Sequence, residues 1–212
     1  MAYYYQERYL LPLSHDEVVH GKATIMQKMY GDYDGKFPQA RAFYMYMYAH
    51  PGKKLNFMGN EIGQLREWDE KREQDWCLLS YPAHDGFFHF MADLNHFYLE
   101  HSSLWEQDYE EGGFQWLDCH QEEKCIYAFE RRSRKERLVA VFNFSDKKVD
   151  DFVLKEEHLI SKFHIVCVSK KDKEELMERL GALRACFPFP RLLKISEIAD
   201  THWSKKDGLA WL

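Results

Sequence analysis

The sequence lacks the features that mark secreted, membrane-spanning and nucleic-acid-binding proteins. No apolar run approaches the roughly 18 residues that a membrane-spanning helix needs. The first eight residues have neither the basic nor the apolar region of a signal peptide. The net charge of the chain is −6, so no overall positive field attracts nucleic acid. We therefore expect a cytoplasmic protein with no membrane partner and no nucleic-acid partner.

Cysteine is also sparse, and its spacing carries no motif. The five cysteines are scattered along the chain, and no two of them have the Cys-x-x-Cys spacing of a metal site. An odd number of cysteines favours reduced thiols in the cytosol over a framework of disulfides.

Apolar and aromatic residues are plentiful by contrast. They make up 45% and 16% of the 212 residues, which is enough for a hydrophobic core and argues against disorder. A chain of this length holds one domain or two.

Residues 1–104 alternate between strand-like and helix-like segments. The predicted strands are residues 9–13 and 55–58, and the predicted helices are residues 23–30, 38–50 and 86–98. Pro38 suits the first turn of the second helix, because proline loses no hydrogen bond there. Each predicted strand stops at a polar cluster, and active sites of (β/α)8 barrels lie at such carboxyl ends of strands.

From about residue 105 the pattern changes to period two, which is typical of a small antiparallel β domain. The predicted strands are residues 115–118, 125–130 and 138–144. The basic segment 131–137 fits a solvated hairpin loop, with nucleic-acid binding as a less favoured alternative. Beyond it, residues 163–168 suggest a strand and residues 172–186 a helix, with no recognisable chemistry.

The most informative segment is Leu-Pro-Leu-Ser-His-Asp-Glu-Val-Val-His-Gly-Lys at residues 11–22, which leaves several chemistries open. A Ser14–His15–Asp16 triad is a poor fit, because adjacent side chains on a strand point to opposite faces. A metal site would need ligands whose spacing matches no standard pattern, namely His15, Asp16, His20 and Glu61.

Two further interpretations of the segment involve no metal. Carboxylates at two neighbouring strand ends, Asp16 and Glu61, together with His15, suit the stabilisation of a glycosyl cation. An ordinary loop between a strand and a helix, with capping Ser and Asp residues, explains the same pattern without any function.

Segment 11–22 resembles the fourth conserved region of bacterial 1,4-α-glucan (glycogen) branching enzymes, in the α-amylase superfamily. The likeness covers roughly residues 9–154. It continues through residues 31–33, 49–54, 57–64, 66–68, 75–76, 79–82 and 93–96, and more weakly from 113 to 144.

The resemblance implies an α/β plus β architecture in three parts. Residues 1–104 correspond to the last two βα units of a (β/α)8 TIM barrel. Residues 105–154 correspond to the start of an antiparallel C-terminal β-sandwich. Residues 155–212 stop resembling the family and form a divergent, irregular α/β tail of unknown role.

The resemblance also implies roles for particular residues. His15 and Asp16 match the family's histidine and third catalytic carboxylate, which grip the sugar, with Asp16 as an ionised stabiliser of the transition state. The residues that match the loop after the last barrel strand are expected to bind the α-glucan: Glu61, Gln64, Arg66, Glu67 and Trp68. The family transfers α-1,4-glucan chains to a 6-hydroxyl and needs no metal or organic cofactor.

Neither the family's nucleophile nor its acid/base residue has a matching motif in this chain. We therefore expect the chain alone to be catalytically incomplete and to need the missing amino-terminal part of the enzyme as a partner. Two alternatives stay open, a non-catalytic glucan-binding or interaction protein and a hydrolase of the same superfamily.

Overall fold

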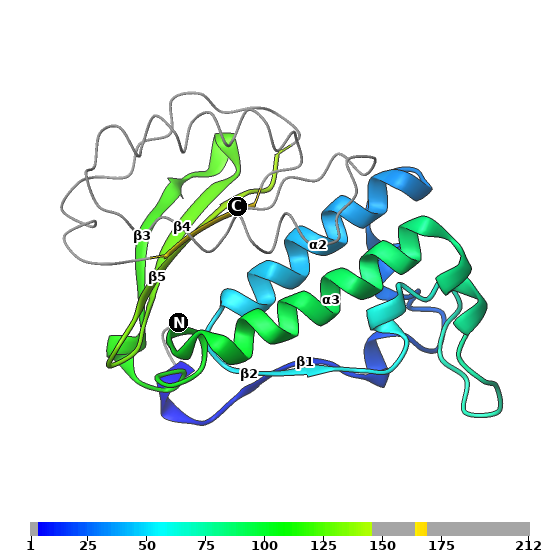
Figure 1. The fold of residues 1–212 in the computed structure, drawn as a ribbon, viewed down its shortest axis with the longest axis horizontal. Helices are drawn as coiled ribbons and strands as arrows, with labels where there is room; N and C mark the ends of the chain where they lie inside the picture. Colours follow the sequence, from blue (N-terminus) through cyan, green and yellow to red (C-terminus); the bar gives the residue numbers. More distant parts are fainter. Residues whose placement is uncertain (1–3, 146–163, 169–212) are drawn as a thin grey trace.

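The computed structural model describes residues 4–145 and 164–168, and Figure 1 shows how they are arranged. Strands β1 (Leu10–Leu13) and β2 (Lys53–Asn56) are parallel, with Leu10 opposite Lys53. The chain between them forms the short helix α1 (Ile25–Lys28) and the long helix α2 (Tyr33–Ala49). Helix α3 (Pro82–Glu100) follows β2 and lies beside α2 on the same side of the strand pair.

The β1–α2–β2 unit fits the predicted alternation of strands and helices. In the described residues these two strands form a sheet of their own and no closed barrel. The (β/α)8 barrel therefore stays a prediction, and so do the domain boundaries at residues 104 and 154.

Helix α2 begins earlier than the sequence predicted. Asp32 caps it, because its Oδ1 accepts a hydrogen bond of 2.9 Å from the N–H of Gly35. Pro38 thus lies inside the helix, and the prediction that it occupies the first turn was wrong. The Asp32 carboxylate sets the start of the helix, and the helix tolerates the loss of the one backbone hydrogen bond that Pro38 cannot donate. It ends at Ala49, since the residue before Pro51 is driven to an extended conformation.

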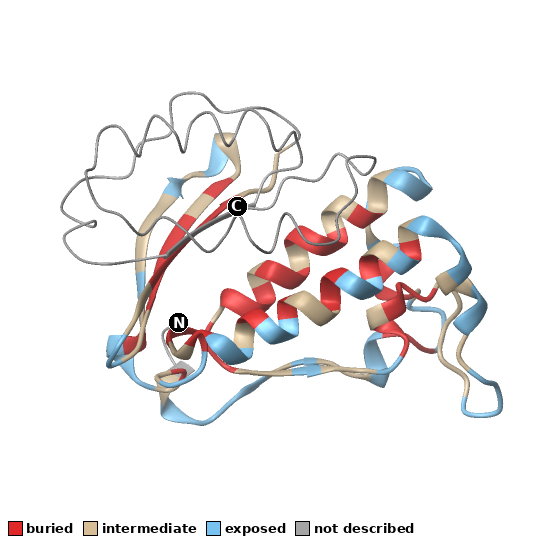
Figure 2. Ribbon diagram, in the orientation of Figure 1, coloured by how far each residue is buried: buried red, intermediate tan, exposed pale blue. Residues whose placement is uncertain are grey.

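The core lies between α2, α3 and the β-sheet. Figure 2 shows buried residues where the two helices face each other, and they continue onto the strands. The buried face of α3 has the predicted helical spacing, with Phe87, Phe90, Met91, Leu94 and Phe97. Helix α2 reaches the sheet through Tyr46, whose ring centroid lies 5.1 Å from that of Phe142.

The second part is a sheet in the order β3–β4–β5–β6. Its strands are β3 (Phe114–Gln121), β4 (Ile126–Arg132), β5 (Arg137–Asn143) and β6 (His164–Val168). The first three are antiparallel, which confirms the predicted antiparallel sheet. Strand β6 pairs parallel to β5, and the sequence had suggested a strand there without predicting its pairing direction. The predicted helix at 172–186 lies outside the described residues.

The basic segment 131–137 is not simply a solvated loop. Arg131 and Arg132 belong to β4 and Arg137 to β5, and Arg131 is completely buried. The prediction missed this burial because the partners of Arg131 lie 18 to 82 residues away in the sequence.

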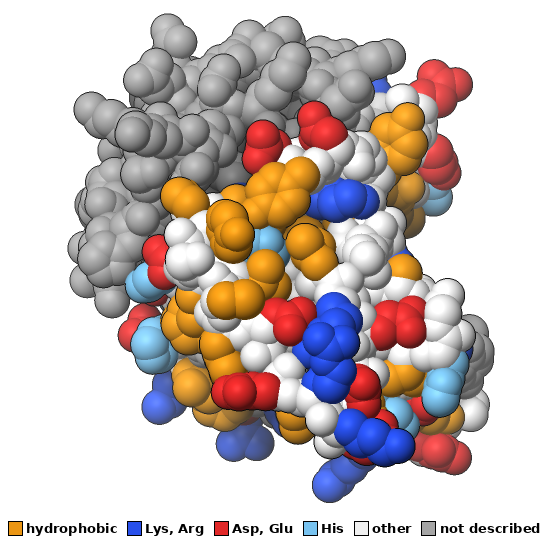
Figure 3. All heavy atoms as spheres, turned by 90° about the vertical axis from the view of Figure 1, so that its right-hand side faces the viewer, with side chains coloured by type: hydrophobic (Ala, Val, Ile, Leu, Met, Phe, Trp, Pro, Cys, Tyr) orange, Lys and Arg blue, Asp and Glu red, His pale blue; other side chains and the backbone are white. Residues whose placement is uncertain are grey.

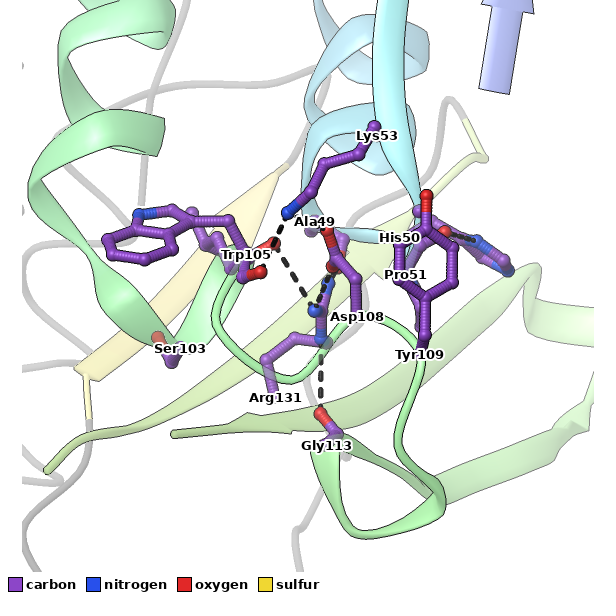
Figure 4. A network of polar contacts seen from close by, with 12 residues as sticks. Ala49, His50, Pro51, Lys53, Ser103, Trp105, Asp108, Tyr109, Gly113 and Arg131 are labelled. Carbon is purple, nitrogen blue, oxygen red and sulfur yellow. Dashed lines mark hydrogen bonds and ion pairs between the residues drawn. The ribbon is translucent and has the colours of Figure 1, made fainter. Parts of the chain in front are cut away.

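Arg131 joins the sheet to the helical part through a buried polar network (Figure 4). Its guanidinium donates to the carbonyl oxygens of Gly113 (3.2 Å), Ala49 (2.7 Å) and Leu104 (3.2 Å), and to Asp108 Oδ1 (2.6 Å). Lys53 Nζ at the start of β2 donates to the other Asp108 oxygen at 2.9 Å. Burial opposes ionisation of Asp108, but these hydrogen bonds and charges hold its pKa below the ordinary range.

A second connection joins the β4–β5 turn to the end of α3. Glu136 accepts hydrogen bonds from His101 Nδ1 (2.5 Å), the Ser103 N–H (3.1 Å) and the Ser103 hydroxyl (3.0 Å). Burial raises the pKa of Glu136, but the hydrogen bonds outweigh it and lower the pKa from 4.5 to about 2.

This pKa predicts how Glu136→Gln changes stability with pH. A lowered carboxyl pKa stabilises the fold fully above pH 4.5 and progressively less as pH falls toward 2. At pH 7 we expect the free energy of unfolding of the variant to be about 2 kcal/mol lower than that of the wild type, after discounting for solvent screening. Urea titrations at pH 7 and at pH 2.5 measure the difference, which should largely disappear at the lower pH. The exposed Glu123→Gln is the control, and a difference that does not change with pH contradicts the assignment.

Candidate functional site

The parallel pairing of β1 and β2 brings two polar loops to the same end of the molecule. Leu13 lies opposite Asn56, and the Phe57 N–H donates to the Leu13 carbonyl at 2.9 Å just beyond the paired residues. Figure 3 looks onto this end, where acidic, basic and hydrophobic side chains all reach the surface. The first loop carries His15 and Asp16, and the second runs from Phe57 to Asp75.

His15 and Asp16 lie on the turn that follows β1. Ser14 caps this turn, because its Oγ accepts a hydrogen bond of 3.3 Å from the Asp16 N–H. His15 Nε2 lies 3.4 Å from Asp16 Oδ1, and both side chains are exposed, at 53% and 68%. Both groups are therefore open to a ligand in solution.

Two aromatic rings lie behind His15. The His15 ring centroid is 6.0 Å from that of Phe57 and 6.1 Å from that of Trp68. Phe57 and Trp68 pack edge to face, 5.3 Å apart. The arrangement is an exposed imidazole on an aromatic floor, with an exposed carboxylate beside it. Such groups can hydrogen-bond sugar hydroxyls, and the carboxylate can stabilise a developing positive charge.

Glu61 lies on the turn Asn60–Ile62 after β2, and it is half-buried. Gly59 at the start of this turn has φ +90°, a left-handed conformation that favours glycine. Asn60 Nδ2 anchors the turn by donating to Asn56 Oδ1 at 3.1 Å. Glu61 makes no hydrogen bond or ion pair with another described residue, so its carboxylate is available for a ligand.

Gln64 and Arg66 brace the second loop from within. Gln64 is buried, and its side chain donates to the Arg66 carbonyl (3.0 Å) and accepts from the Asp75 N–H (3.1 Å). Arg66 Nη2 donates to Asp75 Oδ1 (3.0 Å) and to the Glu73 carbonyl (2.7 Å). Direct glucan binding by Gln64 and Arg66 stays a prediction, and the geometry gives it no support.

Glu67 and Trp68 connect the second loop to the first. The Glu67 carboxylate accepts hydrogen bonds from the N–H groups of Gly21 (2.9 Å) and Ala23 (2.7 Å). These two bonds lower the pKa of Glu67. The Trp68 N–H donates to the Val18 carbonyl at 3.0 Å. The half-buried Trp68 ring belongs to the aromatic floor, which agrees with the packing role that is the alternative to glucan stacking.

The geometry does not favour two of the alternatives. Ser14 is engaged as a cap, which gives no support to a Ser–His–Asp triad. In the part of the chain that the structure describes, no three His, Cys, Asp or Glu side chains come close enough to share a metal ion. No helix in that part is both long and apolar enough to cross a membrane.

Sequence reasoning missed two members of the site. Phe57 was assigned to a strand, yet it follows β2 and supports His15. Asp75 was noted for its resemblance only, although it orders the loop through Arg66 and Gln64. The one available signal was opposite charge nine residues apart, which is too common to single out a pair.

Comparison with known proteins finds one matching family and several similar proteins. Residues 116–171 match the family described as the alpha amylase C-terminal all-beta domain. The 1,4-alpha-glucan branching enzyme of Oceanobacillus iheyensis is 46% identical over 152 residues, which are 71% of this chain and 24% of that protein. Those of Halothermothrix orenii and Aquifex aeolicus are 47% and 48% identical over 145 residues, 68% of this chain and 23% of each.

The chain thus spans about a quarter of the length of the curated relatives that it matches. The matched all-β domain accounts for the antiparallel strands of the sheet. The chain resembles the carboxy-terminal part of the bacterial 1,4-α-glucan branching enzymes of the α-amylase superfamily.

Proposed function

We propose that this chain forms the sugar-holding part of the active site of a branching enzyme. Such an enzyme transfers α-1,4-glucan chains to a 6-hydroxyl. One observation carries the proposal. At the ends of the parallel strands β1 and β2, His15 lies beside the Phe57–Trp68 floor and next to Asp16, in a chain 46–48% identical to branching enzymes over two thirds of its length.

Asp16 and His15 hold the sugar next to the bond that is cleaved. The glycosyl transition state resembles an oxocarbenium ion, and the ionised Asp16 stabilises its positive charge while His15 hydrogen-bonds a hydroxyl. The hydrogen bonds strengthen as the ring flattens, so the pair favours the transition state over the ground state. Glu61 contributes a further acceptor for the glucan, and Trp68 supports the bound sugar through the aromatic floor.

The remaining chemistry comes from a partner. A retaining mechanism needs a nucleophile and an acid/base carboxyl about 5–5.5 Å apart, and no motif of this chain matches either. The missing amino-terminal part of the enzyme supplies both. In this proposal residues 1–104 complete its barrel, and residues 105–154 begin its β domain. The chain by itself does not branch glucan.

Binding of maltoheptaose, a linear α-1,4-glucan, tests the sugar-holding role. Both His15→Ala and Asp16→Asn should weaken binding at least about tenfold, because each removes a hydrogen bond that involves a charged or ionisable group. Isothermal titration calorimetry on the full chain measures the affinities. His96→Ala is the matched control, an exposed histidine on α3 away from the strand ends. Equal affinities in all four proteins would remove His15 and Asp16 from the site.

An iodine-stain assay on linear amylose tests the incompleteness of the chain, with the expected result of no branching. Activity of the purified chain would overturn this part of the proposal. A chain that binds maltoheptaose but is not activated by an added amino-terminal fragment would favour the non-catalytic glucan-binding alternative. Release of short sugars without branches would favour the hydrolase.

A further inference from the structure

Glu67 is the feature of the site whose geometry differs most from its expected role. The resemblance implies a glucan-binding residue, but both carboxylate oxygens accept backbone hydrogen bonds, from Gly21 and Ala23. We infer that Glu67 is a positioning residue that holds the His15–Asp16 loop in place. This inference rests on the proposed function, since it concerns how that site is held.

The backbone held by Glu67 has no regular hydrogen-bond pattern of its own. His20, Gly21 and Ala23 have positive φ values of 59°, 76° and 64°, in the left-handed region that is unfavourable for His and Ala. Such a segment persists only when its surroundings determine it. The two charge-assisted hydrogen bonds to the Glu67 carboxylate hold the backbone in this conformation, since such bonds are stronger than neutral ones.

The restraint extends to Asp16 through Lys22. Lys22 lies between Gly21 and Ala23, and its Nζ donates to the Asp16 backbone carbonyl at 2.8 Å. By holding Gly21 and Ala23, Glu67 also fixes the backbone of Lys22, and the Lys22 side chain in turn holds the Asp16 carbonyl. Lys28 Nζ adds a bond of 2.8 Å to the Ala23 carbonyl from helix α1.

The residue after Glu67 holds the same loop at a second place. The Trp68 N–H donates to the Val18 carbonyl, and the Trp68 ring lies against His15. The dipeptide Glu67–Trp68 thus contacts the first loop at Gly21, Ala23, Val18 and His15. A change of conformation at Glu67 would therefore move His15 and Asp16 even though Glu67 does not contact the sugar.

Nuclear magnetic resonance of the full chain tests the inference without any sugar. The amide protons of Gly21 and Ala23 should shift together as Glu67 is protonated, with an apparent pKa below the ordinary Glu value. The charged and titratable groups beside Glu67 are His20 and Lys28. In Glu67→Gln this shift should be absent, and exchange of the two amides at pH 7 should be about tenfold faster. Glu70→Gln is the control, since Glu70 is exposed on the same loop.

Maltoheptaose affinity tests whether the positioning of the His15–Asp16 loop by Glu67 matters for sugar binding. Glu67→Gln should weaken binding several-fold while the urea midpoint of the whole chain stays near that of Glu70→Gln. Should Glu67→Gln fail to fold, the titration of wild-type Gly21 and Ala23 still decides. Amide shifts that do not titrate, or a loosened loop with unchanged affinity, overturn the positioning role. Absence of maltoheptaose binding in the wild type contradicts the proposed function instead, and the titration then still reports on Glu67.

Discussion

Replacing Arg131 by methionine is expected to lower the free energy of unfolding by about 3–5 kcal/mol, the typical cost of removing one partner of a buried ion pair. Both Arg131 and Asp108 have side chains with no exposed surface, and the guanidinium serves four acceptors. Methionine fills much of the volume but leaves the Asp108 charge and three carbonyl oxygens with fewer partners. Urea unfolding of the full chain at pH 7 measures the loss.

A control and a double variant separate burial from charge. Arg134 is 80% exposed, and its Nε lies 3.8 Å from Glu106 Oε1, so Arg134→Met should change stability by less than about 1 kcal/mol. Arg131→Met combined with Asp108→Asn should recover part of the loss, because the unpaired buried charge is gone. Equal losses from the two single arginine variants would contradict the role assigned to Arg131.

The second large effect is expected in catalysis. In a chimera in which the matched residues of this chain replace those of the Oceanobacillus iheyensis branching enzyme, Asp16→Asn should lower turnover about 10²–10³-fold. This is the usual loss when one group that stabilises transition-state charge is removed. Asparagine keeps the shape of Asp16 and removes its charge, so folding should be unaffected because the side chain is 68% exposed.

The kinetic constants show where the loss occurs. Equal reductions of kcat and kcat/KM identify an interaction that is made only in the transition state. A rise in KM with unchanged kcat identifies an interaction that contributes equally to substrate and transition-state binding. Asp93→Asn on helix α3 serves as the matched control. Unchanged turnover in the Asp16 variant would contradict the role of Asp16 in catalysis.

Sequence patterns predicted the parts of the fold that depend on neighbouring residues. The spacing of Phe87, Phe90 and Leu94 identified helix α3, and the apolar run before Ser14 identified β1. The predicted start of α2 was wrong because Pro38 was expected in the first turn, whereas the helix is capped by Asp32. Strand β6 was expected, but its direction was not, since pairing direction depends on the path of the intervening chain.

The candidate site divides in the same way. The resemblance predicted roles for His15 and Asp16, and the structure places both side chains at the surface, with the His15 ring against an aromatic floor. It did not identify what Glu67 contacts, because Gly21 and Ala23 lie 46 and 44 residues earlier. Residue type shows that a carboxylate accepts hydrogen bonds, whereas only the fold shows which donors reach it.

The network around Arg131 limits how freely the β-sheet can be exchanged between relatives. A segment cut at residue 105 keeps Arg131 and Asp108 but loses Lys53 and the carbonyl oxygens of Ala49 and Leu104. Grafted onto another protein, it fits only where the host provides a cation and two carbonyl oxygens in the same places. The sheet is therefore not an interchangeable module, and its compatibility with a host is decided at the end of α2 and the start of β2.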